Sequence, residues 1–169
     1  MRNLSNTTQK PKRVFTILSI LSIINISFEL FDQFRAVTIG KLSSEQVDKM
    51  IQNARDLTAN IGAEDVYGIF EKMYAVQRIQ NDLFMLSHTI GILTLLTGMA
   101  GVVMMLKTNA LGFQLYIIYS LLSTFGIIFY IPFDFVPFPL VIVNIFISLI
   151  LIFLYYSNRT WKTAKEVEE

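Results

Sequence analysis

The chain has 169 residues, of which 53% are hydrophobic and 16% are charged, and its formal net charge is +1. This near-neutral charge gives no support for a nucleic-acid or acidic-substrate partner. With no cysteine and one histidine, the chain cannot form disulfides, thiolate metal sites or a multi-histidine metal site, and we expect no cofactor. Four separated apolar runs of roughly 20 residues instead predict an all-α polytopic membrane protein with four transmembrane helices.

The first predicted element is a membrane span over residues 14–34. It follows a basic tail, residues 1–13, that carries four Lys or Arg residues. A basic start before an apolar run is also typical of a secretory signal, but no small-x-small cleavage site follows. The run enters the bulky and acidic sequence FELFDQF instead, so we predict that the first span is retained.

Residues 35–82 form a polar segment that contains two helix patterns. Ser43 and Gln46 have the spacing of a capping box, and Gly62 can end the helix that they begin. The two apolar stripes recur at helical spacing, and the second helix can continue into the next span. They comprise Val47, Met50, Ile51, Ala54, Leu57 and Ile61, then Val66, Ile69, Phe70, Met73 and Val76. We therefore predict an extracytoplasmic helical hairpin whose stripes pack on each other or lie at the lipid headgroups.

The second span is predicted over residues 83–106, and its small residues share one side of the helix. They are Gly91, Thr94, Gly98 and Gly101, spaced 3, 4 and 3 residues apart. Small residues at this spacing allow a second helix to approach closely in lipid, where packing drives association. We therefore predict that this side is a helix-packing face.

The third span is predicted over residues 111–131, after a tight turn at 107–110. The sequence PFDFVPFP, residues 132–139, then ends the helix because it holds three prolines, and it predicts an outer turn at the interface. The fourth span is predicted over residues 140–156 and is followed by a tail, residues 157–169. The amino terminus carries four Lys or Arg residues, the 107–110 turn one and the tail three, whereas the 132–139 turn carries none. The positive-inside rule therefore predicts cytoplasmic termini.

The sequence LGFQLYIIYSLL, within residues 107–131, and the layout of the rest of the chain resemble a known group. The pattern of a basic start, one span, a polar external segment and further spans is similar to small uncharacterised bacterial four-span membrane proteins. That group has no assigned activity, so the resemblance implies a topology and an inner-membrane location but no functional site.

One polar constellation is predicted within the membrane. On the first span Ser22, Asn25, Glu29 and Asp32 share a helix face because they are spaced 3, 4 and 3 residues apart. Counting from the span ends at 1.5 Å per residue puts Glu29, His88 and Asn144 roughly 6 to 8 Å inside the outer boundary. Intramembrane ionisable groups are functional hypotheses by default. The candidate cluster is thus Asn25, Glu29, Asp32, His88 and Asn144.

Two interpretations of this cluster remain open. If the first span ends near Phe28, Glu29 and Asp32 are interfacial acids, and His88 makes an interhelical hydrogen bond. If the span is longer, Glu29 and His88 form a buried pair that can serve a proton or solute path.

The function favoured by the sequence is a non-enzymatic accessory or scaffold subunit. Its expected partners are the lipid bilayer and either a second copy or another membrane protein. The alternative is a small oligomeric proton-linked transporter or channel that uses Glu29 and His88. A lipid-modifying enzyme is the third hypothesis, disfavoured because such enzymes need several convergent polar groups.

Overall fold

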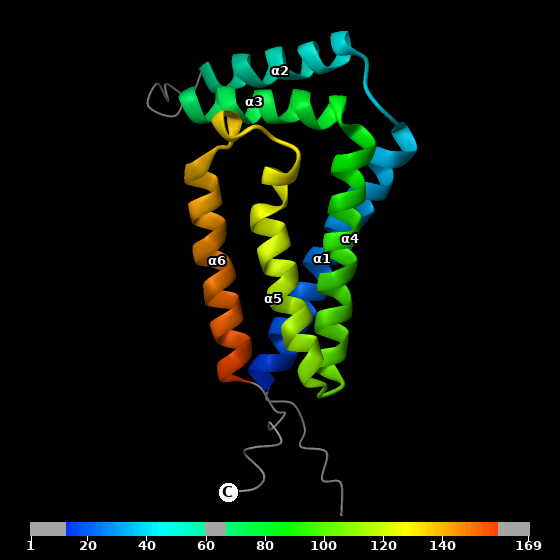
Figure 1. The fold of residues 1–169 in the computed structure, drawn as a ribbon, viewed down its shortest axis with the longest axis vertical. Helices are drawn as coiled ribbons and strands as arrows, with labels where there is room; N and C mark the ends of the chain where they lie inside the picture. Colours follow the sequence, from blue (N-terminus) through cyan, green and yellow to red (C-terminus); the bar gives the residue numbers. More distant parts are fainter. Residues whose placement is uncertain (1–12, 60–66, 159–169) are drawn as a thin grey trace, which may run out of the picture.

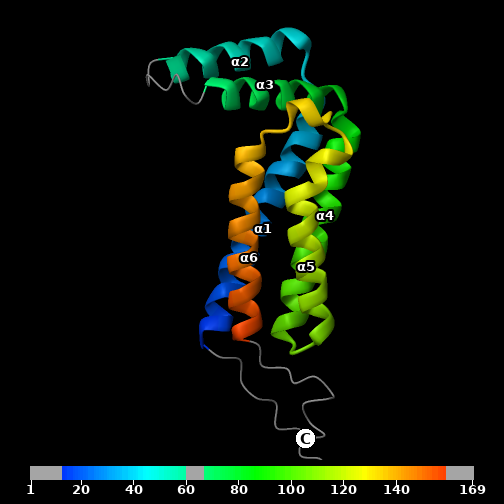
Figure 2. The same cartoon turned by 60° about the vertical axis from the view of Figure 1, so that its left-hand side comes forward.

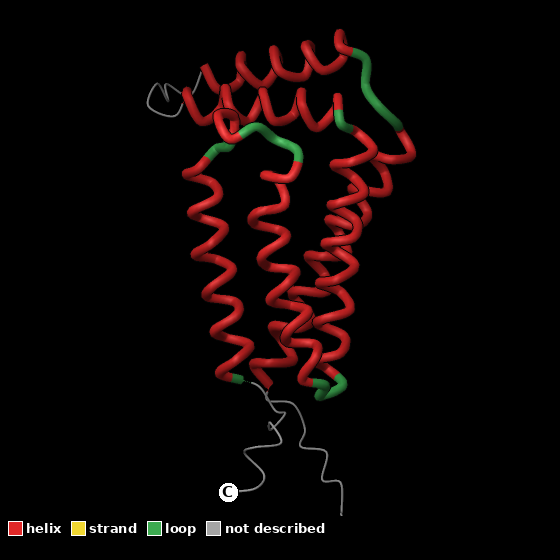
Figure 3. Tube along the Cα trace, viewed as in Figure 1, coloured by secondary structure: helices red, strands yellow, loops and turns green. Residues whose placement is uncertain are grey.

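The computed structural model describes residues 13–59 and 67–158. The two predicted tails lie almost wholly outside these residues, as does the predicted stop at Gly62. The described residues form helices and connecting turns without a strand (Figure 3). Four helices are long and apolar enough to cross a membrane: α1 (Arg13–Ile39), α4 (Phe84–Leu106), α5 (Ala110–Phe125) continued by η2 (Gly126–Phe129), and α6 (Phe138–Ser157). The predicted all-α class and the four spans are thus confirmed.

Helix α1 continues to Ile39, five residues beyond the predicted end of the first span. Its 27 residues span about 40 Å at 1.5 Å per residue, whereas a hydrocarbon core is about 30 Å thick. Gly40 ends the helix with a φ of 84°, and its N–H bonds to the carbonyl of Ala36 at 2.9 Å. Glycine adopts this left-handed conformation without a steric penalty, which explains why the helix stops here.

Helices α2 (Ser44–Ala59) and α3 (Tyr67–Asp82) lie side by side across one end of the bundle, and we call them the α2–α3 pair (Figures 1 and 2). The predicted capping box is confirmed, because Gln46 N–H donates to Ser43 Oγ and Ser43 N–H donates to Gln46 Oε1. Val47 and Ile51 of the first predicted stripe pack with Phe70 of the second and with Tyr74, which the predicted stripe did not include. A bidentate ion pair between Arg55 and Glu71 adds a polar link between the two helices.

A bend separates α3 from α4, where the pattern allowed one continuous helix. Leu83 leaves the helical region with φ −97° and ψ 37°, and the chain turns there from the α2–α3 pair into the bundle (Figure 1). The bend frees backbone carbonyls, and the Ser87 hydroxyl donates to the carbonyl of Gln80 at 3.2 Å. A side chain thus replaces part of the interrupted backbone ladder.

The end of α5 is attached to the α2–α3 pair by a small apolar cluster. The predicted 132–139 turn contains a short 3₁₀ helix, η3 (Phe133–Phe135), and Val136 behind it is fully buried. Val136 packs with Val76 of α3, Ile131 and Val141. This contact holds the α2–α3 pair against the α5–α6 connection.

The main core fills the opposite end of the bundle. It consists of buried apolar side chains from all four spans: Phe15, Ile26, Leu95, Val102, Met105, Tyr116 and Tyr155. The amino-terminal end of α1, the carboxy-terminal end of α6 and the α4–α5 turn all lie there (Figure 1). Helix packing is therefore tight at this end.

Candidate functional site

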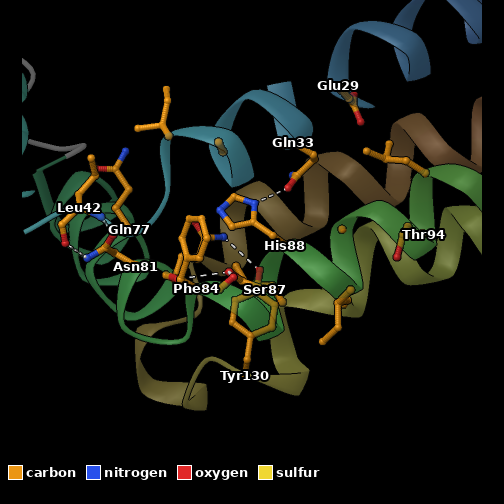
Figure 4. A pocket seen from close by; sticks show the side chains of 18 of the residues that line it. Glu29, Gln33, Leu42, Gln77, Asn81, Phe84, Ser87, His88, Thr94 and Tyr130 are labelled. Carbon is orange, nitrogen blue, oxygen red and sulfur yellow. Dashed lines mark hydrogen bonds between the residues drawn. The ribbon is translucent and has the colours of Figure 1, made fainter. Parts of the chain in front are cut away.

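A cavity of about 570 Å³ lies beneath the α2–α3 pair, between α1, α4 and the α5–η2 segment (Figure 4). Pockets for small ligands have volumes of about 300 to 1,000 Å³ and combine apolar walls with a few polar groups. This cavity has the same character. Its polar lining comprises Glu29, Gln33, Gln77, Gln80, Asn81, Ser87, His88, Thr94, Ser123 and Tyr130.

Hydrogen bonds hold the part of the cavity wall that lies nearest the α2–α3 pair. Asn81 pairs with the backbone of Leu42 twice, accepting from its N–H at 2.9 Å and donating to its carbonyl at 3.0 Å. Gln80 Nε2 donates to the hydroxyl of Tyr130 at 3.0 Å. The segment after α1, the end of α3 and the turn after η2 are thus tied together around the cavity.

His88 lies in the cavity wall with Gln33 as its partner. Its Nδ1 lies 2.6 Å from Gln33 Oε1, and its ring packs against Phe84 with centroids 4.4 Å apart. Gly91, one turn further along α4, makes room for this contact, because a Cβ there would lie 3.1 Å from Gln33 Nε2. The histidine is therefore held in one orientation by an amide from α1 and an aromatic ring from α4.

Glu29 also lines the cavity, but its hydrogen-bond partner Asn25 is on its own helix. Asn25 Nδ2 donates to Glu29 Oε1 at 2.8 Å, an i to i+4 contact along α1. Among the described side chains, no hydrogen bond or ion pair joins Glu29 to His88. The structure thus brings both predicted residues to one cavity without making them a pair.

Asp32 and Asn144 complete the predicted cluster, and neither lines this cavity. Asp32 is exposed on α1 next to the cavity-lining residue Gln33. Asn144 is exposed on α6, and its side chain has no hydrogen-bond partner among the described residues. The five predicted residues therefore divide into Glu29 and His88 at the cavity, Asn25 bonded to Glu29, and two that lie outside it.

The predicted helix-packing face contacts two neighbours. A Cβ at Gly101 would lie 3.0 Å from the carbonyl oxygen of Gly112 on α5, and one at Gly98 would lie 2.6 Å from the ring of Tyr119. Gly91 instead faces Gln33 of α1, and Thr94 is buried in the cavity wall. The face is divided in this way because α4 packs between α1 and α5.

Sequence reasoning missed the amides that make up much of the polar lining: Gln33, Gln77, Gln80 and Asn81. One signal was available for Gln33, since it is an uncharged polar residue near the end of an apolar helix, four residues after Glu29. The other three lie in the polar segment, where amides are common. Nothing in their spacing distinguishes them from a solvated helix face.

The described residues contain no group of three or more His, Asp or Glu side chains that can hold a metal ion. No family model, curated protein or solved structure matches this chain. The proposed function therefore rests on the cavity and its side chains alone.

The geometry predicts which residues are energetically coupled. Gln33→Ala and His88→Ala each remove the same hydrogen bond. We therefore expect the double variant to lose less in melting temperature than the sum of the losses in the two single variants. Coupling between contacting residues is about 0.5 to 3 kcal/mol, whereas separate sites add within about 0.5 kcal/mol. The effects of Glu29→Gln and His88→Ala on the melting temperature should be additive. A double-mutant cycle on melting in one detergent measures both, and coupling of Glu29 rather than Gln33 would contradict the assignment.

Proposed function

We propose that this chain is a non-enzymatic integral membrane protein that binds a small polar group in the cavity beneath the α2–α3 pair. It acts as an accessory subunit, and the α2–α3 pair is the part that a partner can reach outside the membrane. The observation that carries the proposal is the cavity, which combines pocket-sized volume with polar side chains from α1, α3, α4 and α5.

The polar lining selects the charge of the ligand. No Lys or Arg is among the residues that line the cavity in the described part of the chain, and Glu29 is the one carboxylate there. An anion such as phosphate would therefore lack a counter-charge and would meet a like charge. Amides, hydroxyls and the histidine supply both donors and acceptors. These groups favour an uncharged hydroxyl-bearing ligand or a small cation.

Binding is favoured over catalysis by the arrangement of these polar groups. His88 is hydrogen-bonded to Gln33, and Glu29 is hydrogen-bonded to Asn25. Among the described residues, neither makes a hydrogen bond to a serine or threonine hydroxyl that it could activate. A nucleophile and base within hydrogen-bond reach are the usual sign of covalent catalysis. The cavity therefore supports recognition of a ligand better than a reaction upon it.

Purified protein should be stabilised by myo-inositol and ethanolamine, and not by inorganic phosphate, in thermal melts in one detergent. Ser123→Phe should remove the stabilisation, because Ser123 lines the cavity and the larger ring fills space there. Ser27→Phe is the matched control, since Ser27 is an exposed position outside the cavity. Equal shifts in Ser123→Phe and in wild type would refute binding in this cavity.

The second candidate is a proton-linked transporter or channel, favoured by the presence of both Glu29 and His88 in the cavity lining. The core of α1, α4, α5 and α6 closes the opposite half of the bundle, so a path would need an oligomer or a second conformation. Proton flux into liposomes that disappears in Glu29→Gln and persists in Asp32→Asn would favour this candidate over simple binding.

We further propose an inner-membrane location with both termini in the cytoplasm. The support is the four Lys or Arg residues in 1–13, the three in 157–169 and Lys107 in the α4–α5 turn, compared with none in the 132–139 turn. Because the chain has no cysteine, single variants report on topology without background. In intact cells, an impermeant thiol reagent should label Asn53→Cys in α2 and spare Ser5→Cys and Thr163→Cys; the reverse pattern would invert the orientation.

A further inference from the structure

The cavity has an opening within the depth of the membrane. Glu29 both lines the cavity and is exposed, so it marks a place where the cavity reaches the outer surface of the bundle. The span ends predicted from the sequence place Glu29 roughly 6 to 8 Å inside the outer boundary of the membrane. Half of a hydrocarbon core is about 15 Å thick. This opening therefore meets lipid, in addition to the opening near the exposed residues Ile39 and Met50 at the α2–α3 pair.

Glu29 marks this opening on α1, and no residue of α6 lines the cavity. Helices α1 and α6 meet at their ends far from the α2–α3 pair, where the Tyr155 hydroxyl donates to Ser22 Oγ at 2.9 Å, and they diverge toward the pair (Figure 1). Glu29 follows Ser22 by seven residues, and Asn144 precedes Tyr155 by eleven. Both spacings are within about 20° of whole helical turns. Glu29 therefore lies on the same side of α1 as Ser22, and Asn144 lies on the same side of α6 as Tyr155, where the two helices diverge.

Glu29 and Asn144 have unused hydrogen-bonding capacity. Asn144 is exposed on an apolar helix with no partner among the described side chains, and among these side chains Glu29 accepts a hydrogen bond from Asn25 alone. A carboxylate or an amide that faces hydrocarbon without a partner is costly. A polar head that donates hydrogen bonds would satisfy both groups while its chain remains in the lipid.

We infer that the ligand is a membrane-resident amphiphile with an uncharged hydroxyl-bearing or amine-bearing head, which enters the cavity sideways past Glu29 of α1. This inference rests on the proposed function and names the ligand class for the same site. The head lies among Glu29, Gln33 and His88, and the chain leaves through the opening at Glu29. An anionic head is excluded from the class because its charge would adjoin Glu29.

Three probes with the same hydrocarbon chain test this class: monoolein, oleylamine and oleic acid. Each is added at a small mole fraction to nanodiscs of phosphatidylcholine that hold the full chain, and thermal unfolding is followed. Monoolein and oleylamine should raise the melting temperature and oleic acid should not. Their half-maximal concentrations should be at least about tenfold below those of glycerol and ethanolamine, because burial of methylene groups adds to binding.

Matched variants locate the head. Glu29→Gln should weaken the oleylamine effect by about tenfold, the usual result of removing one charged hydrogen bond, and should leave most of the monoolein effect. Asp32→Asn is the control, because Asp32 is an exposed acid on the same helix outside the cavity lining, and it should change neither. Asn144→Leu should weaken both probes, since it removes the polar group on the α6 side.

Three results would overturn the inference. They are stabilisation by oleic acid equal to that by oleylamine, the same loss in Asp32→Asn as in Glu29→Gln, or no gain from the hydrocarbon chain over the short analogues. In the last case, if myo-inositol or ethanolamine still stabilises wild type but not Ser123→Phe, the proposed function stands and only the amphiphile is refuted. If no probe of either kind binds, both fail.

Discussion

Replacement of Tyr155 by alanine is expected to destabilise the bundle by about 3 to 5 kcal/mol, the range for loss of a large buried ring. Tyr155 is fully buried, its ring packs edge-on against Phe15 and Tyr116, and its hydroxyl donates to Ser22. These contacts join α6 to α1 and α5. Since α6 buries only two of its residues, Val141 and Tyr155, loss of this ring removes much of what holds the helix in place.

Two further variants separate the ring from the hydroxyl. Tyr155→Phe keeps the ring and should cost about 0.6 kcal/mol, the average for a hydrogen bond between membrane helices. Phe153→Ala removes a ring of similar size that is 67% exposed on the same helix, and it should cost little because that ring faces lipid before and after unfolding. Equilibrium unfolding in one detergent measures all three. A Phe153→Ala cost equal to that of Tyr155→Ala would mean that α6 packs elsewhere.

The substitution Gly112→Ala is expected to destabilise the protein by about 1 to 3 kcal/mol, as overpacking does. A Cβ at position 112 would lie 2.5 Å from the backbone nitrogen of Met105 and 2.6 Å from the carbonyl oxygen of Gly101. Both atoms belong to the backbone of α4, so the contact can be relieved only by moving one helix away from the other. Helix propensity alone predicts the opposite sign, a gain of about 1 kcal/mol.

Two other glycines test whether this loss comes from helix contact. Gly126→Ala adds a Cβ whose nearest neighbour is 3.7 Å away, and Gly68→Ala adds one with nothing within 4 Å. Neither should lower the melting temperature measured in the same detergent. If Gly112→Ala has the same melting temperature as these two controls, α4 and α5 are not in close contact. The packing of Gly101 against Gly112 would then be wrong.

The small-residue pattern shows how far the sequence could predict the packing. The spacing of Gly91, Thr94, Gly98 and Gly101 indicates a side of α4 that a helix can approach, because spacing determines which residues share a face. It does not indicate which helix approaches. The close contact at Gly101 needs Gly112 opposite it, whereas Gly91 is opposite the side chain of Gln33. Each partner depends on how α1 and α5 are rotated about their own axes.

The candidate site was less predictable than the spans. Depth along a helix can be counted from the sequence, which predicts similar depths for Glu29 and His88, and the structure places both residues in the lining of one cavity. The contact between His88 and Gln33 could not be predicted, since it joins residues 55 positions apart across two helices. Gln80 and Asn81 form part of the cavity wall because the chain bends at Leu83. The continuous helical pattern of the sequence does not reveal this bend.

The sequence by itself determined the four spans, the proline-rich turn and the capping box at Ser43. These features depend on local properties, namely the hydropathy, length and backbone chemistry of one segment at a time. The tertiary structure alone decided the cavity, the orientation of its polar groups and the divergence of α6 from α1. Each of these depends on how helices rotate and tilt against one another, and that is set by contacts between distant residues, such as the Tyr155 hydroxyl with Ser22.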